Sequence, residues 1–180
     1  MAFIYLHKGK ELTRNPLLDK FLEKYKHGLK EYKSIEIGAG NLLNSIPISH
    51  YFTKYDAIEP DQVLYNIGKR NIERYESSID LRNEEFSDCK EEYDLVIFIN
   101  SIHFIDTALL RAKYILVIHP KYDGDNFGDT RLNRNSDNFN LVLWHKNKSQ
   151  LEKYERFIRD NYKIVYEDSN KKQTLLVCKR

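Results

Sequence analysis

Disulfide bonds and a metal centre are the first features that this sequence argues against. Its 180 residues include only two cysteines, Cys89 and Cys178, which lie far apart without paired spacing. That arrangement fits a reducing compartment and predicts neither a disulfide framework nor a metal site. With 41% hydrophobic and 31% charged residues, the composition is that of an ordinary folded protein and not of a disordered one.

Long apolar runs and an excess of one charge are also missing. No apolar run approaches the roughly 18 residues that a membrane helix needs, and the amino terminus lacks the apolar region of a signal peptide. The 29 basic residues nearly balance the 27 acidic ones, so no global basic field indicates nucleic-acid binding, although a local basic patch stays open. We therefore expect a cytoplasmic or nuclear protein without membrane contact.

Strand patterns alternate with helical patterns along most of the chain. The sequence predicts buried strands at residues 34–37, 55–59, 94–100 and 113–118, and a weaker strand at 77–82. It predicts helices from Pro16 with Asn15 as the N-cap, from Leu42 or Leu43 with Pro47 shortening or displacing the helix, over 62–75, and over 102–112. The helix over 62–75 is expected to turn Val63, Leu64, Ile67 and Ile72 inward. This alternation indicates a single three-layer α/β domain that spans residues 1–180.

The remaining parts of the chain are less regular. The apolar run at 2–6 within the amino-terminal part, 1–30, is either an edge strand or a loose arm. The variable region 121–148 includes a polar loop, 121–138, that either lines an acceptor pocket or is a flexible insertion. A capping box at Ser149 predicts a last helix, and two strands after it, 163–167 and 174–179, predict an antiparallel hairpin.

The stretch Ser34–Asn41 joins the first buried strand to a glycine turn. Gly38 and Gly40 permit positive φ angles and let a ligand approach the backbone, and Glu36 lies two residues before the first glycine. Glu59 ends the next strand roughly 20 residues later, the interval at which a β-α-β unit places an acidic residue beside a ribose. These residues predict a nucleoside-binding corner, unless the glycines only form a tight turn.

Three short segments in this order resemble the class I S-adenosylmethionine-dependent methyltransferases. They are Glu36-Ile-Gly-Ala-Gly40, Ala57-Ile-Glu-Pro-Asp61, and Tyr93 to His103. The resemblance covers about residues 30–180. It implies a Rossmann-like α/β/α sandwich, with a mostly parallel seven-stranded sheet that has one antiparallel strand in the carboxyl-terminal hairpin. It also implies S-adenosylmethionine as the cofactor, in a cofactor-binding half at 34–118.

A dinucleotide is the rival ligand for the same corner. Its G-x-G-x-x-G/A motif needs a third small residue, so that the helix packs close to the strand beneath a pyrophosphate. Leu43 stands at that position here. S-adenosylmethionine has no phosphates, and the resembling family does not require a small residue there, so the sequence favours the methyl donor.

The resemblance also assigns candidate cofactor contacts. Glu36 accepts from the ammonium group or through water, Glu59 takes both ribose hydroxyls, and either Asn83 or Glu84 meets the adenine amino group. The full set of candidates is Glu36, Gly38, Ala39, Gly40, Glu59, Pro60, Asn83, Glu84, Phe86 and Asn100. Asp61 is expected beside the adenine together with Pro60.

Asn100 and His103 are the candidate catalytic residues. The resemblance places Asn100 beneath the sulfonium, facing the substrate. Asn100 is followed by Ser101-Ile102-His103 and not by the Pro-Pro-aromatic of many enzymes that methylate amino groups, which favours a small-molecule acceptor. His103, whose ordinary pKa lies near 6.5, is either a general base or a structural residue.

Two functions from different classes fit these observations. The first is an S-adenosylmethionine-dependent methyltransferase that acts on a small or medium-sized acceptor through an oxygen, nitrogen or sulfur nucleophile. The second is a catalytically inactive methyltransferase-like subunit that binds RNA or a partner protein. RNA or protein stays possible as the acceptor of an active enzyme, and the sequence carries no signal for the oligomeric state.

Overall fold

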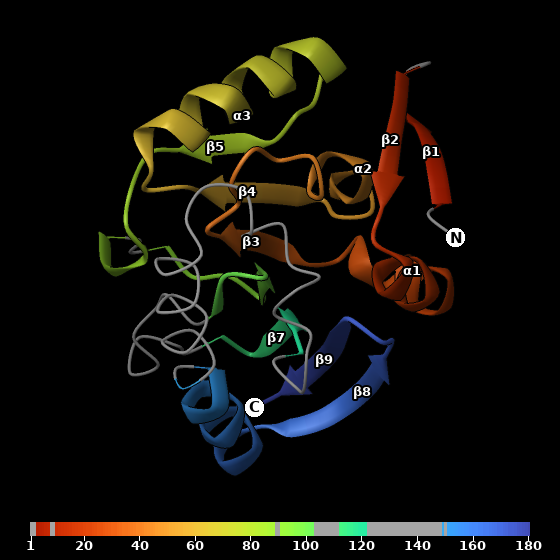
Figure 1. The fold of residues 1–180 in the computed structure, drawn as a ribbon, viewed down its shortest axis with the longest axis vertical. Helices are drawn as coiled ribbons and strands as arrows, with labels where there is room; N and C mark the ends of the chain where they lie inside the picture. Colours follow the sequence, from red (N-terminus) through yellow and green to blue (C-terminus); the bar gives the residue numbers. More distant parts are fainter. Residues whose placement is uncertain (1–2, 8–9, 89–90, 103–111, 122–148, 150) are drawn as a thin grey trace, which may run out of the picture.

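A seven-stranded sheet forms the centre of the protein in the computed structural model, which describes residues 3–7, 10–88, 91–102, 112–121, 149 and 151–180 (Figure 1). Its strands are β3 (Lys33–Ile37), β4 (Lys54–Ile58), β5 (Asp80–Arg82), β6 (Leu95–Ile99), β7 (Tyr114–Pro120), β8 (Lys163–Ser169) and β9 (Gln173–Lys179). They lie in the order β5-β4-β3-β6-β7-β9-β8. Strand β9 pairs antiparallel with β7 and with β8, while the other neighbours pair in parallel. The prediction of one reversed strand in the hairpin is confirmed.

Helices cover both faces of this sheet. Helices α1 (Pro16–Leu29), α2 (Ile46–Ser49) and α3 (Gln62–Tyr75) pack on one face, where their apolar side chains form one core with Leu81, Leu95 and Ile97. Residues 151–161 are helical and pack on the other face, against a second core that includes Ile35 and Phe98. Because neighbouring strand residues point to opposite faces, each buried strand contributes to both cores. The expected three layers are confirmed.

The amino-terminal run is the first strand of a hairpin. Strand β1 (Phe3–His7) pairs antiparallel with β2 (Lys10–Arg14) in a separate two-stranded sheet. Arg14 anchors this hairpin, because its Nε contacts Asp19 of α1 at 2.5 Å and its Nη1 donates to the Tyr51 hydroxyl at 2.9 Å. Asn15 then caps α1 as predicted, with its side chain accepting from the Leu17 N–H at 3.0 Å.

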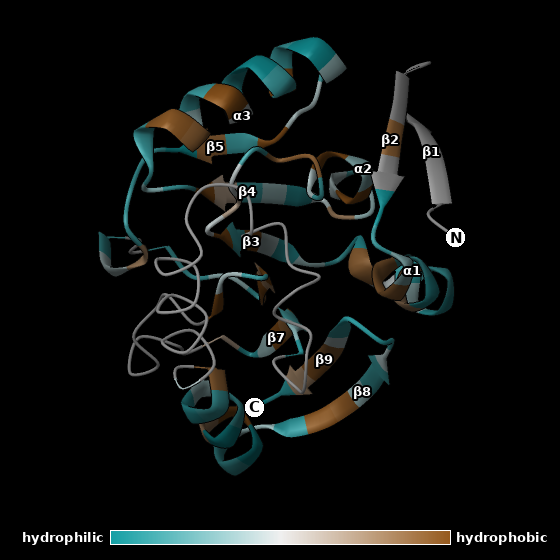
Figure 2. Ribbon diagram, viewed as in Figure 1, coloured by the Kyte–Doolittle hydropathy of each residue, from teal (hydrophilic) through white to brown (hydrophobic). Residues whose placement is uncertain are grey.

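Two predictions about helices were wrong. The helix after the glycine turn begins at Ile46 and not at Leu42 or Leu43, because Leu42 adopts a left-handed φ of 64° that no helix accommodates. Val63 and Leu64 do not face inward but are 67% and 39% exposed. The hydrophobic turn near the start of α3 is visible in Figure 2.

The inner face of α3 is built around a glycine. Gly68 and Tyr75 are its buried residues, and Ile72 packs against the core as predicted. A Cβ on Gly68 would lie 2.8 Å from a Leu81 methyl carbon and 3.4 Å from the Gly40 carbonyl oxygen. The missing side chain therefore lets α3 approach both β5 and the glycine turn, a contact that a hydrophobic pattern does not reveal.

Several predictions concern residues outside the described ones. These are the helix over 102–112 apart from its two end residues, the variable region 121–148 apart from residue 121, and His103. Among the helices that the structure does describe, none is long and apolar enough to cross a membrane.

Gly68→Ala is expected to lower the free energy of unfolding by about 1–3 kcal/mol, because the new methyl group overpacks the contact between α3 and Leu81. Gly28→Ala in α1 is the matched control. Its Cβ would meet no atom within 4 Å, so better helix propensity is expected to stabilise the fold by about 0.5–1 kcal/mol. Urea unfolding of both variants measures these changes, and equal effects would contradict the proposed close packing.

Candidate functional site

The candidate site lies where the strand order reverses. From β3 the chain proceeds outward through β4 and β5, and then returns to β6 on the other side of β3. The carboxyl ends of β3 and β6 therefore lie at the switch point of the strand order, the position at which α/β proteins commonly bind ligands. The glycine turn follows β3, and Asn100 follows β6.

Gly38 is required by packing inside the protein. Its φ is 66°, and a Cβ there would lie 2.8 Å from the Cβ of Ser101. The Ser101 hydroxyl donates to the Ile37 carbonyl, which ties the end of β3 to the residue after Asn100. The Gly38 and Ala39 N–H groups both donate to the Ile58 carbonyl, at 2.9 and 3.0 Å. Gly38 and Ala39 thus help to hold the ends of β3, β4 and β6 together, and both are also predicted to lie beside the cofactor.

Gly40 differs from Gly38 because it borders open space. Its φ is 60°, and a Cβ there would meet no atom within 4 Å. The backbone at Gly40 is therefore open to a ligand, and any side chain would project into that space.

Glu59, the residue after β4, holds the glycine turn through hydrogen bonds. Its Oε2 accepts from the Gly40 N–H at 2.7 Å and its Oε1 accepts from the Asp61 N–H at 3.0 Å, while its side chain is only 5% exposed. Asp61 in turn caps α3 by accepting from the Val63 and Leu64 N–H groups. Each oxygen of Glu59 keeps a second lone pair, so the predicted role toward ribose hydroxyls remains chemically available.

Glu36 lies in a more closed position than its predicted role requires. Its carboxylate is 1% exposed and accepts from the Tyr55 hydroxyl at 2.6 Å. Burial is the largest cause that raises the pKa of Glu36 to about 7; hydrogen bonds from the Ser45 and Tyr55 hydroxyls oppose this rise, and the charge of Glu59 adds a smaller contribution to it. Glu36 therefore already has a partner inside the protein, and a ligand would have to displace Tyr55 or reach Glu36 through water.

Asn83 and Glu84, the two candidates for the adenine contact, have different partners in the structure. Nδ2 of Asn83 donates to the Glu59 carbonyl at 2.8 Å and to the Pro60 carbonyl at 3.1 Å, which leaves its Oδ1 free to accept. That is the polarity that an adenine amino group needs. Glu84 instead forms an ion pair with Arg82 at 3.0 Å. Phe86, in a short 3₁₀ turn (Phe86–Asp88), is half-buried against the second core.

Asn100 is oriented by a chain of amide hydrogen bonds. Asn15 accepts from the Leu17 N–H through Oδ1, so its Nδ2 is the atom that donates to Oε1 of Gln173, at 2.8 Å. Gln173 consequently donates from Nε2 to Oδ1 of Asn100, at 3.0 Å. A backbone N–H can only donate, so this series fixes all three amide orientations. Among the described residues, none accepts from Nδ2 of Asn100, which is left as a donor at the candidate site.

A second histidine lies near this position, whereas His103 itself is outside the described residues. His119 follows Ile118, whose carbonyl accepts from the Asn100 N–H at 2.7 Å. His119 is buried, its Nδ1 lies 3.1 Å from the Pro120 carbonyl oxygen, and burial lowers the pKa of its imidazole. The neutral ring that results is the form that accepts a proton.

Sequence patterns alone missed Ser101, Tyr55 and Gln173. Each makes a contact with a residue far away in the chain, namely Ile37, Glu36 and Asn100. Parallel pairing of Ser34 with Tyr55 offered a partial signal for one of these, because it places Tyr55 two positions from Ala57, the residue opposite Glu36, and therefore on the same face of the sheet. Within the described residues, no three His, Cys, Asp or Glu side chains are arranged to hold a metal ion.

Comparison with known proteins depends on the fold, because no family model matches the chain and no curated protein matches its sequence. The structure is similar to magnesium protoporphyrin IX methyltransferase from Synechocystis PCC 6803, solved with bound S-adenosylhomocysteine, with a TM-score of 0.61 and 13% identity over 91% of this chain and 82% of that one. It is also similar to the 16S rRNA methylase ArmA, with a TM-score of 0.54 and 16% identity over 89% and 80%. The chain has the class I methyltransferase fold. At these identities the likeness concerns the fold, and the two neighbours act on different substrates.

Alanine substitutions of the two glycines of the turn are expected to have different effects. Gly38→Ala combines left-handed strain with the overlap at Ser101, and is expected to lower the free energy of unfolding by about 2–4 kcal/mol. Gly40→Ala carries the strain alone, so a loss of about 1 kcal/mol is expected. Denaturant unfolding measures both values. A Gly40 variant as unstable as the Gly38 variant would contradict the open space above Gly40.

Glu36 is expected to make stability depend on pH. Because its pKa is about 7 in the folded protein and 4.5 in the reference state, the folded form binds a proton more tightly, and this contribution is complete below about pH 4.5. It is lost as the pH rises to about 7, which lowers the free energy of unfolding by up to about 3 kcal/mol. Glu36→Gln removes this dependence. Urea unfolding at pH 5 and pH 8 measures it, and parallel changes in both proteins would contradict the assignment.

Proposed function

We propose that this protein is an S-adenosylmethionine-dependent methyltransferase that acts on a small or medium-sized acceptor. The observation that carries the proposal is the pairing of an open backbone at Gly40 with the carboxylate of Glu59, at the strand-order reversal of a class I methyltransferase fold. A carboxylate whose two oxygens are already positioned by backbone N–H groups suits the two adjacent hydroxyls of a ribose.

The residues of the site fit this cofactor. Gly40 leaves free the space that a Cβ would occupy, and Asn83 directs an acceptor oxygen outward beside Pro60. In the proposal, Glu59 holds the ribose and Asn83 accepts from the adenine amino group. Ala39 and Gly38 shape the backbone of the turn beneath the ligand, and Glu36 supports that turn from below. When bound, S-adenosylmethionine supplies an electrophilic methyl group on a positively charged sulfur.

Side chains that follow β6, and one near the end of β7, are proposed to bind and deprotonate the methyl acceptor. Asn100 offers its Nδ2 as a hydrogen-bond donor that orients the acceptor, and Gln173 keeps that amide from rotating. His103 is proposed to take the proton that an oxygen, nitrogen or sulfur nucleophile loses on methylation. His119 is a described alternative, since its buried imidazole favours the neutral form. Alignment of the acceptor supplies much of the rate of such a transfer.

The free Nδ2 group of Asn100 favours a substrate that carries a hydrogen-bond-accepting atom. An amino group donates hydrogen bonds and is best oriented by an amide oxygen. In this chain the oxygen of Asn100 already accepts from Gln173, and the N–H groups are left. A phenolate, alkoxide or carboxylate oxygen on the substrate can accept hydrogen bonds from these N–H groups. This favours a small oxygen acceptor over an exocyclic amine of a nucleic-acid base.

The second candidate function is an inactive methyltransferase-like binding subunit. The burial of Glu36 beneath Tyr55 favours it, because the carboxylate is withdrawn from direct contact with a cofactor. In this case the fold would present a surface to RNA or to a partner protein and would transfer no methyl group.

Binding of S-adenosylmethionine and of S-adenosylhomocysteine decides between the two. We expect both to raise the melting temperature and to bind in calorimetry. Glu59→Gln is expected to weaken binding about 10- to 100-fold, because one charged acceptor is lost. Glu73→Gln, at an exposed position of α3, is the matched control and is expected to bind as the parent does.

Both outcomes of this experiment are informative. If neither S-adenosylmethionine nor S-adenosylhomocysteine binds the folded protein, the proposal of an active enzyme is overturned and the inactive subunit is favoured. If binding occurs, a panel of small phenols and carboxylic acids, with an RNA oligonucleotide in parallel, is expected to show methylation of a small acceptor. Methylation of RNA alone would contradict the proposed acceptor class.

A further inference from the structure

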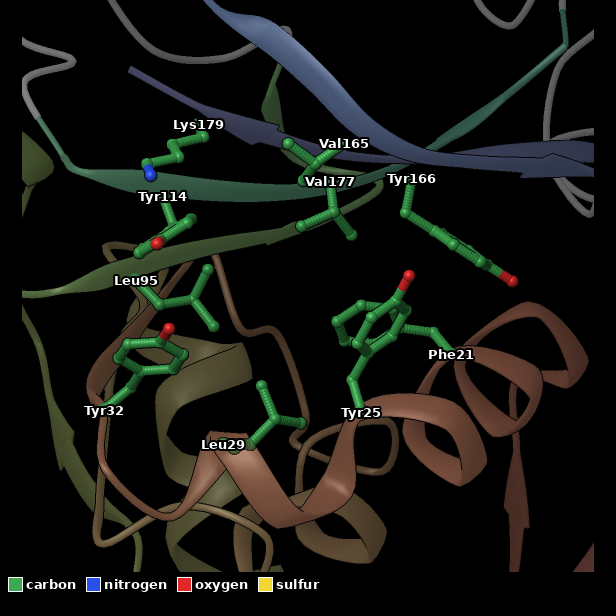
Figure 3. A pocket seen from close by; sticks show the side chains of 11 residues that line it. Phe21, Tyr25, Leu29, Tyr32, Leu95, Tyr114, Val165, Tyr166, Val177 and Lys179 are labelled. Carbon is green, nitrogen blue, oxygen red and sulfur yellow. The ribbon is translucent and has the colours of Figure 1, made fainter.

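A separate cavity of about 310 Å³ lies between the second half of α1 and strands β7, β9 and β8 (Figure 3). Figure 3 shows two aromatic walls that face each other across aliphatic side chains, which include Leu29, Leu95 and Val177. One wall consists of Phe21, Tyr25 and Tyr166, and the other of Tyr32 and Tyr114. Nothing in the proposed methyl transfer uses these residues.

The aromatic rings are packed into two preformed surfaces. In the first wall the ring centroids of Phe21 lie 5.0 Å from Tyr25 and 5.5 Å from Tyr166, and the Tyr25 and Tyr166 rings meet edge to face at 5.7 Å. In the second wall the Tyr32 and Tyr114 centroids lie 5.3 Å apart. Such pairs hold each other in position, so the rings present fixed apolar surfaces to a flat ligand.

The cavity lies at the amino ends of β6 and β7, whereas the candidate cofactor site lies at the carboxyl ends of β3 and β6. Leu95 and Tyr114 are the first residues of β6 and β7, whereas Asn100 follows the last residue of β6. A strand of this length spans about 16 Å, so a ligand in the cavity would not touch the glycine turn. Val165 of β8 lines the cavity and is 46% exposed, which opens it to solvent at the sheet edge.

Lysines supply positive charge around the walls. Lys179 lines the cavity and its Nζ lies 5.9 Å from the Tyr114 centroid, and the Nζ of Lys113 lies 5.5 Å from the same ring. The Nζ of Lys24 lies 5.1 Å from the Tyr25 centroid and 5.8 Å from that of Tyr166. Across the described part of the chain, no carboxylate forms an ion pair with any of these three lysines, whereas nearby Lys20 pairs with Asp168 at 2.9 Å.

We propose that this cavity binds a planar, mostly apolar small molecule of one or two rings that carries a carboxylate. The rings offer stacking surfaces, and the unpaired ammonium groups complement one negative charge. A volume near 310 Å³ falls at the lower end of the range for small-molecule sites, which limits the ligand to that size. A ligand of this kind would bind independently of the cofactor.

Gly28 provides a variant that fills the cavity without disturbing existing contacts. It lines the cavity, and a Cβ there would meet no atom within 4 Å. Gly28→Leu is therefore expected to fold and to occupy the space that the ligand requires. Its affinity for S-adenosylhomocysteine is expected to stay unchanged, which distinguishes this site from the one at Gly40.

Calorimetry with 2-naphthoate tests the proposal, with neutral 2-naphthalenemethanol and 1-naphthyl phosphate as comparison ligands. We expect 2-naphthoate to bind at least fivefold more tightly than the neutral analogue and more tightly than the phosphate. Gly28→Leu is expected to weaken its binding at least tenfold. Lys179→Gln is expected to weaken it about threefold to tenfold while binding of the neutral analogue stays the same. Lys171→Gln, at an exposed position of the β8–β9 turn, is the control and is expected to have no effect.

Each other outcome overturns a defined part of the proposal. If none of the three probes binds, or if Gly28→Leu binds 2-naphthoate as the parent does, the cavity is not the site. Equal affinity for the neutral analogue would overturn the role of the carboxylate and the lysines. Tighter binding of the phosphate would overturn the choice of a carboxylate as the anionic group.

Discussion

The candidate site depends on two hydrogen bonds that one buried carboxylate accepts from backbone N–H groups. Glu59 joins Gly40 to Asp61, and therefore joins the turn after β3 to the amino-terminal cap of α3. Removing the carboxylate would leave two donors without partners, each at a cost of about 1–3 kcal/mol. The same oxygens that hold the turn closed are those best placed to meet a ribose, so structure and proposed binding depend on one side chain.

The two glycines of the turn show how packing and ligand access are divided. Gly38 faces the interior, where Ser101 approaches it so closely that a methyl group would not fit. Gly40 faces open space. Beneath them, the Tyr55 hydroxyl holds Glu36 in a position where burial raises the pKa of the carboxyl to about 7. A turn that is rigid below and open above is suited to hold a nucleoside in one orientation.

Different kinds of residues lie at the two ends of the parallel strands. At the carboxyl ends of β3, β4 and β6, backbone groups and amide side chains with defined polarity surround the candidate cofactor site. At the opposite ends of β6 and β7, α1 leaves an aromatic cavity over β7, β9 and β8, with lysines beside its aromatic rings. The helix α1 connects the two ends, because Asn15 at its start holds Gln173 and Tyr25 near its end lines the cavity.

The sequence by itself determined the order of the elements, the reversed last strand, the cap of α1 at Asn15 and the positions of Gly38, Gly40 and Glu59. These depend on patterns within short segments, such as apolar runs, turn residues and a fixed interval between two strands. Only the tertiary structure decided that α2 begins at Ile46, that Val63 and Leu64 face solvent, that Asn83 donates to two carbonyls whereas Glu84 pairs with Arg82, and that Asn100 offers a donor. Each of these depends on a contact between residues distant in the chain, and local patterns hold no information about which side chains such contacts leave unpaired.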